Sequence, residues 1–250
     1  FCESIKTMKP IFIWAHRGAS ALAPENTLAA FQEAESAGAD GLELDIHLSR
    51  EGVPVVIHDE TLDRTTSGRG NVDRHPLSVL RRLDAGAWFS PRFSGERVPT
   101  LRETLDWAGE RLRMNVEIKT AGAGRAVLAA LRDHPRARVL VSSFDHRLLV
   151  GLGKAFPGLP LGFLSESRFW RRGMKRAAAA GAESFHPRRD RVSRQMIAAC
   201  HRHGLQVHSW TVDDPRQART LIRMGIDGLF TNDPARLRAE LGRPGPGGFF

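Results

Sequence analysis

Short apolar, strand-like segments alternate with helical patterns along most of this chain, and this alternation restricts the possible folds more than any other feature of the sequence. Parallel strands need long crossover connections, usually helices, so a regular alternation predicts a parallel sheet. From Met114 onward the expected strands begin about every 21–24 residues, close to the length of one strand–helix unit. We expect eight strands, at Ile11–Ala15, Gly41–Ile46, Met114–Ile118, Arg138–Ser143, Leu161–Leu164, Glu183–His186, Leu205–Thr211 and Asp227–Thr231.

Helical patterns fill the intervals between these strands. Several are followed by a glycine, at Gly38, Gly181, Gly204 and Gly225, which is the residue that most often ends a helix and lets the chain turn into the next strand. A length of 250 residues is typical of a single α/β barrel and is also compatible with two small domains. The clearest helical patterns are Thr27–Ala37, Leu101–Leu112, Gly124–Asp133, His146–Phe156, Ser193–His203 and Pro215–Met224.

One interval breaks this rhythm, because about 70 residues separate the second expected strand from Met114, roughly three times the usual spacing. It begins with a further strand, Val53–Ile57, and contains a short helical pattern, Leu77–Leu83. An insertion after a barrel strand would lie over the mouth of the barrel, where active sites are found. We therefore expect one barrel domain at residues 9–242, an inserted subdomain over the active site at residues 59–99, and terminal extensions at residues 1–8 and 243–250.

The composition is that of an ordinary globular chain, with 41% hydrophobic and 26% charged residues. No apolar run approaches the roughly 18 residues that a membrane-spanning helix needs, so we expect no stable membrane insertion. The apolar stretch after Pro10 ends after about six residues, below the ~7–15 of a signal-peptide core, and Met8 is a natural start. Cys2 and Cys200 can form neither a disulfide framework nor a thiolate metal site, which favours a reducing, cytoplasmic location.

The net charge of +9 would attract phosphates of any kind, including those of nucleic acids and anionic lipids. The arginines are nevertheless scattered along the chain and are not interleaved with aromatic residues, as they are on surfaces that stack nucleic-acid bases. We therefore expect no nucleic-acid partner.

Polar clusters follow five of the strand-like segments at the point where each segment stops. The carboxyl ends of the strands of a parallel barrel converge on one mouth, so these clusters would face one another there. Their composition suits a metal ion held against a phosphate. The clusters are His16-Arg17, Glu43 with Asp45, Glu117 with Lys119, Ser142-Ser143 and Trp210-Thr211.

Three of these residues, Glu43, Asp45 and Glu117, are candidate metal ligands. Glu43 and Asp45 are two residues apart in a strand, so their side chains point to the same face. Buried carboxylates need a charged partner, and a divalent cation would be one. Oxygen ligands alone favour a hard ion, Mg²⁺ or Ca²⁺, over zinc or copper. The alternative is a buried ion pair between one of these carboxylates and an arginine.

His16 and His58 each follow a strand, and two histidines at a barrel mouth suit a general acid and a general base. A lone histidine is more often structural, and His47 competes for the role because it shares the strand face of Glu43 and Asp45.

Arg17 and Lys119 are candidate phosphate-binding residues, since a guanidinium can form a fork onto a phosphate and an ammonium is a compact point charge. Trp210 could stack on a small polyol or belong to the core. Glu25 and Asn26 precede an amphipathic helical pattern, and a role in capping this helix competes equally with a role in binding a ligand.

The segments HRGASALAPENT, GLELDIHLSREGVPVVIHDETLDRTTSGRG, NVEIK, SSF, HSWTV and DGLFTNDP together resemble the glycerophosphodiester phosphodiesterase family. The elements are individually short, but their order and intervals match from about Ile11 to Pro234, which makes the combination specific. The resemblance implies an α/β fold, a (β/α)8 TIM barrel with a small insertion between the second and third βα units. It also implies residue roles: His16 and His58 catalytic, Glu43, Asp45 and Glu117 metal ligands, Arg17 and Lys119 at the phosphate, and Trp210 near the glycerol.

By the same resemblance we expect one divalent cation, Mg²⁺ or Ca²⁺, and hydrolysis of glycerophosphodiesters, such as glycerophosphocholine and glycerophosphoethanolamine, to glycerol 3-phosphate and an alcohol. The small-molecule substrate would be bound by a monomer or homodimer. Two alternatives stay open: a phospholipase D-like lyase of the same fold that releases a cyclic phosphate, and a non-catalytic barrel that binds phosphate or lipid. The departures from the family are minor: the chain has no tyrosine, and Ser165–Arg176 is unusually basic.

Overall fold

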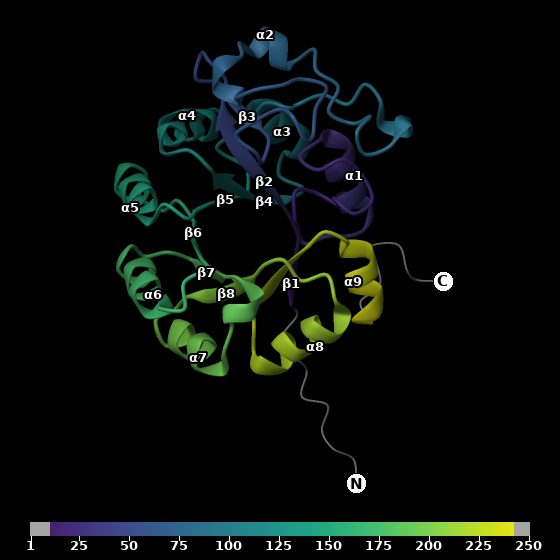
Figure 1. Cartoon of the computed structure of the whole chain (residues 1–250). Helices are drawn as coiled ribbons and strands as arrows, with labels where there is room; N and C mark the ends of the chain where they lie inside the picture. Colours follow the sequence, from purple (N-terminus) through teal and green to yellow (C-terminus); the bar gives the residue numbers. More distant parts are fainter. Residues whose placement is uncertain (1–10, 243–250) are drawn as a thin grey trace.

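The computed structural model describes residues 11–242; the expected extensions at residues 1–8 and 243–250, and Cys2, lie outside them. Eight parallel strands close into a barrel in the order β1-β9-β8-β7-β6-β5-β4-β2, with β2 pairing back onto β1 (Figure 1). The predicted TIM barrel is therefore confirmed. The strands are β1 (Phe12–Ala15), β2 (Gly41–Leu48), β4 (Arg113–Ile118), β5 (Val139–Ser143), β6 (Leu161–Ser165), β7 (Ser184–Pro187), β8 (Gln206–Ser209) and β9 (Gly228–Thr231).

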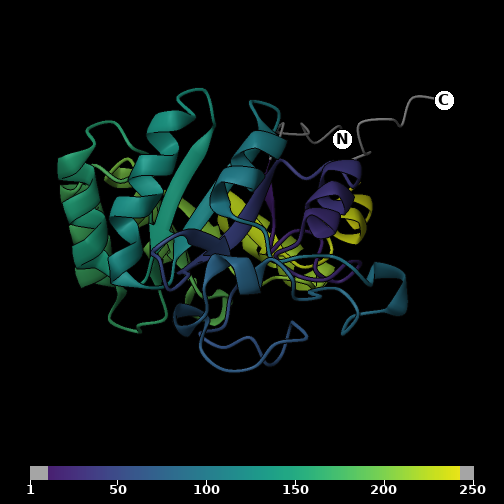
Figure 2. The ribbon, with the colours of Figure 1, turned by 90° about the horizontal axis from the view of Figure 1, so that it is seen from above.

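Helices surround the strands, as both views of the ribbon show (Figures 1 and 2). Each helix turns an apolar side to the barrel, and most have a side-chain cap. In the helix after the long insertion, the Thr100 hydroxyl and the Glu103 carboxylate form a reciprocal capping box. The helices are α1 (Leu28–Ser36), α3 (Leu101–Ala108), α4 (Gly124–Asp133), α5 (His146–Ala155), α6 (Trp170–Ala179), α7 (Arg194–Arg202), α8 (Pro215–Met224) and α9 (Pro234–Glu240).

Large rings fill the interior of the barrel on the side of β1, β7, β8 and β9. The Trp14 indole N–H donates to Nδ1 of His208 at 3.0 Å, and the rings of His208 and His186 stack at 5.4 Å. Glycine on a neighbouring strand makes room for Trp14, since a Cβ at Gly41 would lie 2.6 Å from its ring. This packed interior forms a floor beneath the carboxyl ends of the strands.

The long interval between β2 and β4 contains the extra strand β3 (Pro54–Val56), which pairs antiparallel with β2, and the short helix α2 (Leu77–Leu80) (Figure 1). Two 3-10 turns, Val72–Arg74 and Pro91–Phe93, and the barrel helix α3 complete the regular structure of this interval. The predicted limits of an inserted subdomain, residues 59–99, stay a prediction. The segment does have a small apolar core of its own. That core consists of Val55, Ile57, Leu62, Val72, Leu80, Ala85 and Val98.

Within residues 11–242, none of the helices combines the length and the apolarity that crossing a membrane requires.

Candidate active site

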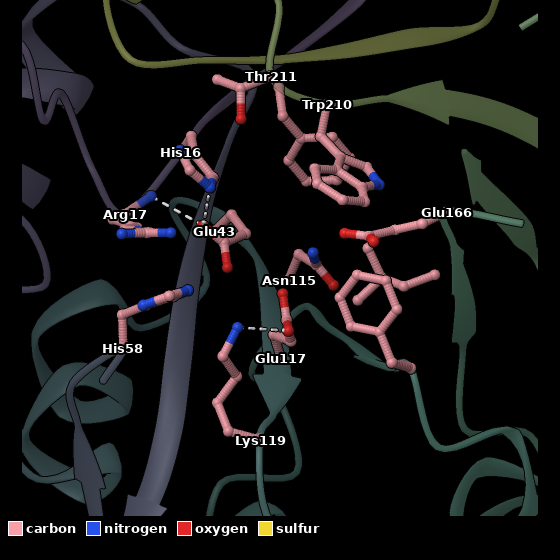
Figure 3. Close-up of a pocket in the computed structure, with 13 residues that line it drawn as sticks. His16, Arg17, Glu43, His58, Asn115, Glu117, Lys119, Glu166, Trp210 and Thr211 are labelled. Carbon is pink, nitrogen blue, oxygen red and sulfur yellow. Dashed lines mark hydrogen bonds and ion pairs between the residues drawn. The ribbon is translucent and has the colours of Figure 1, made fainter. Parts of the chain in front are cut away.

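A cavity of about 180 Å³ opens at the carboxyl ends of the barrel strands (Figure 3). Seven of the eight residues selected from the sequence line it, and the eighth, Asp45, contacts two of them. The structure therefore brings all the predicted site residues together. The lining residues are His16, Arg17, Glu43, His58, Asn115, Glu117, Lys119, Phe144, Leu164, Glu166, Trp210, Thr211 and Phe230.

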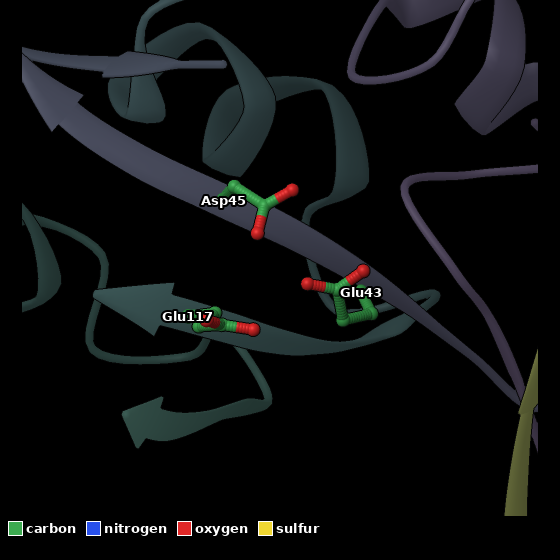
Figure 4. Close-up of side chains that lie close together, drawn as sticks. All are labelled: Glu43, Asp45 and Glu117. Carbon is green, nitrogen blue, oxygen red and sulfur yellow. The ribbon is translucent and has the colours of Figure 1, made fainter. Parts of the chain in front are cut away.

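Glu43, Asp45 and Glu117 form a buried acidic triad (Figure 4). The strands β2 and β4 are neighbours, and the register places Asp45 beside Glu117, so that the candidate ligand oxygens lie within 4.8 Å of one another. Oε1 of Glu43 is buried and has no hydrogen-bond partner. A cation would satisfy this oxygen and the crowded negative charge at once, and three carboxylates suit a hard divalent ion.

The same crowding perturbs the acid–base properties of the triad. Burial and the charge of Asp45 raise the pKa of Glu43 well above its usual range, and they raise the pKa of Glu117 to about 7. Asp45 is also buried, but the charges of Lys119 and Arg17 outweigh burial and hold its pKa well below the usual range. The triad therefore holds less than its full negative charge near neutral pH in the absence of a cation.

Two cationic side chains border the triad. Nζ of Lys119 lies 2.7 Å from Oε1 of Glu117 and 3.2 Å from Oδ1 of Asp45. Burial opposes the charge of Lys119, but Asp45 and Glu117 more than compensate and raise its pKa to about 12. Arg17 donates its backbone N–H to Oε2 of Glu43 at 2.8 Å and places Nε 3.5 Å from Oδ2 of Asp45. Both residues stay charged at any physiological pH.

The backbone of Arg17 adopts a φ of +57°, in the left-handed region that residues with a Cβ rarely occupy. This conformation costs roughly 1–3 kcal/mol and persists only where the surroundings impose it. Here it accompanies the contact of the Arg17 N–H with Glu43.

His16 is held by Asn232, the residue that follows the last barrel strand. Its Nδ1 lies 2.7 Å from Oδ1 of Asn232, and the Asn232 amide nitrogen donates to Asp213 at 2.7 Å. The amide oxygen of Asn232 therefore faces the imidazole, so Nδ1 of His16 carries the hydrogen and Nε2 presents a lone pair. Burial and the charge of Arg17 lower the pKa of His16 to about 4, which makes the ring neutral at pH 7. Nε2 lies 3.9 Å from Oε2 of Glu43.

His58 has a different environment. Its Nδ1 lies 2.7 Å from Oδ1 of Asp59, and Arg64 donates two hydrogen bonds of 2.7 and 2.9 Å to the same carboxylate. These bonds from Arg64 hold the pKa of Asp59 well below its usual range. His47, the competing candidate, does not line the cavity; its Nε2 bonds the backbone carbonyl of His58 at 3.0 Å and supports that residue.

The helix-capping role considered for Asn26 is wrong. Thr27 caps α1, accepting from the N–H of Ala30 at 3.3 Å. The Asn26 amide instead donates to Oδ2 of Asp45 at 2.9 Å and accepts from its N–H at 3.2 Å. Glu25 does not cap the helix either, because its carboxylate bonds Arg17 and Arg64.

An aromatic wall faces the charged residues across the cavity (Figure 3). The Trp210 indole N–H donates to the carbonyl of His186 at 2.8 Å, and the ring of Phe144 meets the Trp210 ring edge-on at 5.6 Å. Glu166 lies beside this wall. Phe144, Glu166 and Asn232 were not among the candidate site residues, although each follows an expected strand, and Phe144 and Asn232 lie in the SSF and DGLFTNDP segments.

Comparisons with known proteins agree over nearly the whole chain. The profile described as "Glycerophosphoryl diester phosphodiesterase family" matches residues 16–236. A glycerophosphodiester phosphodiesterase of Caldanaerobacter subterraneus is 38% identical over 240 residues, covering 92% of this chain and 97% of that protein. Another from Bacillus subtilis is 32% identical over 243 residues, covering 88% and 83%.

Among solved structures, a phosphodiesterase of Oleispira antarctica in complex with the product sn-glycerol-3-phosphate superposes with a TM-score of 0.86. It is 29% identical, and the match covers 92% of this chain and 96% of that one. The chain therefore belongs to the glycerophosphoryl diester phosphodiesterase family and is a hydrolase of phosphoric diesters.

Proposed function

We propose that this enzyme hydrolyses glycerophosphodiesters, such as glycerophosphocholine and glycerophosphoethanolamine, to glycerol 3-phosphate and an alcohol. The observation that carries the proposal is a single cavity at which two imidazoles, those of His16 and His58, meet the buried acidic triad. The product bound to the similar Oleispira antarctica enzyme supports glycerol 3-phosphate as the product here. A monomeric or homodimeric state, a cytoplasmic location and the lack of a nucleic-acid partner stay predictions from the sequence.

The proposed cofactor is one divalent cation, Mg²⁺ or Ca²⁺, held by Glu43, Asp45 and Glu117. When bound, such an ion polarises a phosphoryl oxygen and neutralises negative charge in the transition state. Arg17 and Lys119 supply fixed positive charge on either side of the triad for the remaining phosphate oxygens. This arrangement binds the transition state more strongly than the ground state, because negative charge accumulates on the oxygens as the bond to phosphorus forms.

His16 is the proposed general base and His58 the proposed general acid. A neutral His16 with a free Nε2 can accept the proton of the attacking group, either water or the 2-hydroxyl of the glycerol. His58, whose Nδ1 is held by Asp59 at 2.7 Å, supplies the proton to the leaving alcohol. Trp210 would pack against the glycerol carbons, with its indole N–H already occupied by His186.

The test is turnover of glycerophosphocholine followed by phosphorus NMR. We expect EDTA to abolish turnover and Mg²⁺ or Ca²⁺ to restore it. His16→Ala and His58→Ala should each lower kcat by about 10²–10⁴-fold. The matched control is His203→Ala, which removes an exposed imidazole at the end of α7 and should leave kcat unchanged.

Full activity of the metal-free protein would refute the metal assignment, and unchanged kcat in either active-site variant would remove that histidine from the mechanism. A cyclic phosphate as the only phosphorus product would favour the lyase alternative.

A further inference from the structure

The first turn of α6 combines exposed aromatic and basic side chains at the mouth of the barrel. Phe169 has 74% of its surface exposed, although a ring of this size is usually at least half buried. Phe144, 46% exposed, follows the neighbouring strand β5 and lines the cavity. Because α6 begins shortly after β6 ends, and β5 runs parallel to β6, Phe169 and Phe144 lie at the same end of the barrel.

Five basic residues accompany Phe169, and the α6 basic patch is defined by them: Arg168, Arg171, Arg172, Lys175 and Arg176. Within residues 11–242, no member of the patch forms an ion pair. Four of them occupy one side of α6, while Met174 and Ala177 on the other side are buried against the barrel. Nothing inside the fold therefore accounts for this concentration of positive charge.

The patch is not needed by the proposed reaction, because Arg17 and Lys119 already supply positive charge inside the cavity. Unpaired arginines also repel one another and destabilise the folded chain slightly. Their placement around an exposed ring fits an external surface that carries negative charge and has an apolar layer beneath it. A bilayer of anionic phospholipid has both, since its headgroups attract arginine and its acyl boundary accepts an aromatic ring.

A nucleic acid offers the negative charge but fits the remaining features less well. Surfaces that bind single strands present several aromatic rings on which successive bases stack. Here the neighbouring ring, Trp170, is partly buried and Arg171 already lies over it at 4.7 Å, which leaves Phe169 as the one exposed ring within the patch. A single ring surrounded by arginines favours a membrane surface.

We propose that Phe169 and the mouth-end arginines Arg168, Arg171 and Arg172 dock the barrel on anionic phospholipid membranes. Phe169 enters the headgroup layer and the three guanidiniums pair with lipid phosphates. The cavity then opens toward the membrane surface. This surface function goes beyond hydrolysis and does not depend on it.

Docking is tested by sedimentation with vesicles of neutral phosphatidylcholine, with and without about 30% phosphatidylglycerol, at low and high salt. We expect the protein to bind only the anionic vesicles and to be released by salt. Replacing Arg168, Arg171 and Arg172 by glutamine should lower the partition coefficient about 100-fold, from the usual contribution of a basic residue near an anionic surface. The control replaces Arg132, Arg136 and Arg138, three exposed arginines near the C-terminal end of α4 and the start of β5, which is the opposite end of the barrel.

Phe169→Ser tests the apolar part separately. Phe169 occupies the N-cap position of α6, where serine is favoured, so this variant should fold as well as the parent. We expect it to lower binding to anionic vesicles about 10-fold. Equal losses in the two arginine triples, or binding unaffected by Phe169→Ser, would overturn the proposal. Binding to a single-stranded oligonucleotide that needs the same arginines, with no vesicle binding, would replace it by a nucleic-acid site.

Discussion

Replacing Glu117 by glutamine should change how the stability of the metal-free enzyme depends on pH. Glu117 is only 8% exposed, and Nζ of Lys119 contacts both its carboxylate and that of Asp45. Burial and the charge of Asp45 raise its pKa from an ordinary 4.5 to about 7. That difference corresponds to about 3 kcal/mol of free energy that favours the protonated form in the folded chain.

The sign follows from proton uptake. Between pH 4.5 and about 7, the folded chain holds a proton on Glu117 that the unfolded chain has released. The contribution of this group to stability is therefore complete below pH 4.5 and is lost as the pH rises through 7. Glutamine resembles the protonated acid at every pH, so its contribution stays constant. The free energy of unfolding of the parent, minus that of Glu117→Gln, should fall by about 3 kcal/mol across this interval.

The assay is urea unfolding in EDTA, followed by tryptophan fluorescence at a series of pH values. His16 also titrates in this region with the opposite trend, because burial lowers its pKa to about 4, but its contribution is common to both proteins and cancels in the difference. The matched control is Glu110→Gln, which removes an exposed carboxylate near the end of α3. Parallel pH profiles for the parent and Glu117→Gln would refute the reasoning.

Adding Mg²⁺ at about 100 times its dissociation constant should then raise the free energy of unfolding of the parent by about 2.7 kcal/mol. The gain should be smaller for Glu117→Gln, which lacks one of the proposed ligands. Since the ion binds ionised carboxylates, this stabilisation should increase with pH. A gain that is the same at pH 5 and pH 8 would contradict the triad as the binding site.

Two further substitutions test other contacts. Asn232→Ala removes the partner that orients His16, and we expect kcat to fall about 10–100-fold with little change in KM; an unchanged kcat in steady-state kinetics would show that the imidazole needs no such support. Gly41→Ala would bring a Cβ within 2.6 Å of the Trp14 ring and should lower the free energy of unfolding in urea by about 1–3 kcal/mol. The control, Gly151→Ala, lies in a helix with open space around it and should raise the free energy of unfolding by up to about 1 kcal/mol. Equal effects of the two substitutions would contradict the packing account.

The strands were predictable to within a few residues because each is largely buried and built around apolar residues, even where carboxylates interrupt the apolar residues, as in β2 and β4. The largest difference is at β8, expected over Leu205–Thr211 and observed over Gln206–Ser209. Helix α6 was not among the expected helices. Only Met174 and Ala177 are buried in it, and the intervening arginines obscure the periodicity on which such a prediction depends.

The residues of the site were predictable where chemistry and position at a strand end coincided, as for the acidic triad and His16. Contacts between segments that are distant in the sequence could not be predicted. The role of Asn26 depends on meeting Asp45, and that of Asn232 on the pairing of the last strand with the first, which only the closed barrel brings about. A local pattern cannot distinguish an amide that caps a helix from one that reaches across the sheet.

The contact between His16 and Asn232 links the two ends of the described chain through the proposed general base. During synthesis, the carboxylates of β2 and β4 can meet long before Asn232 leaves the ribosome, whereas the imidazole acquires its orientation only when β9 is inserted. A nascent or truncated polypeptide would thus gather the acids of the site without a competent base. With His16 as the proposed general base, we expect hydrolytic activity only after the whole ring of strands has closed.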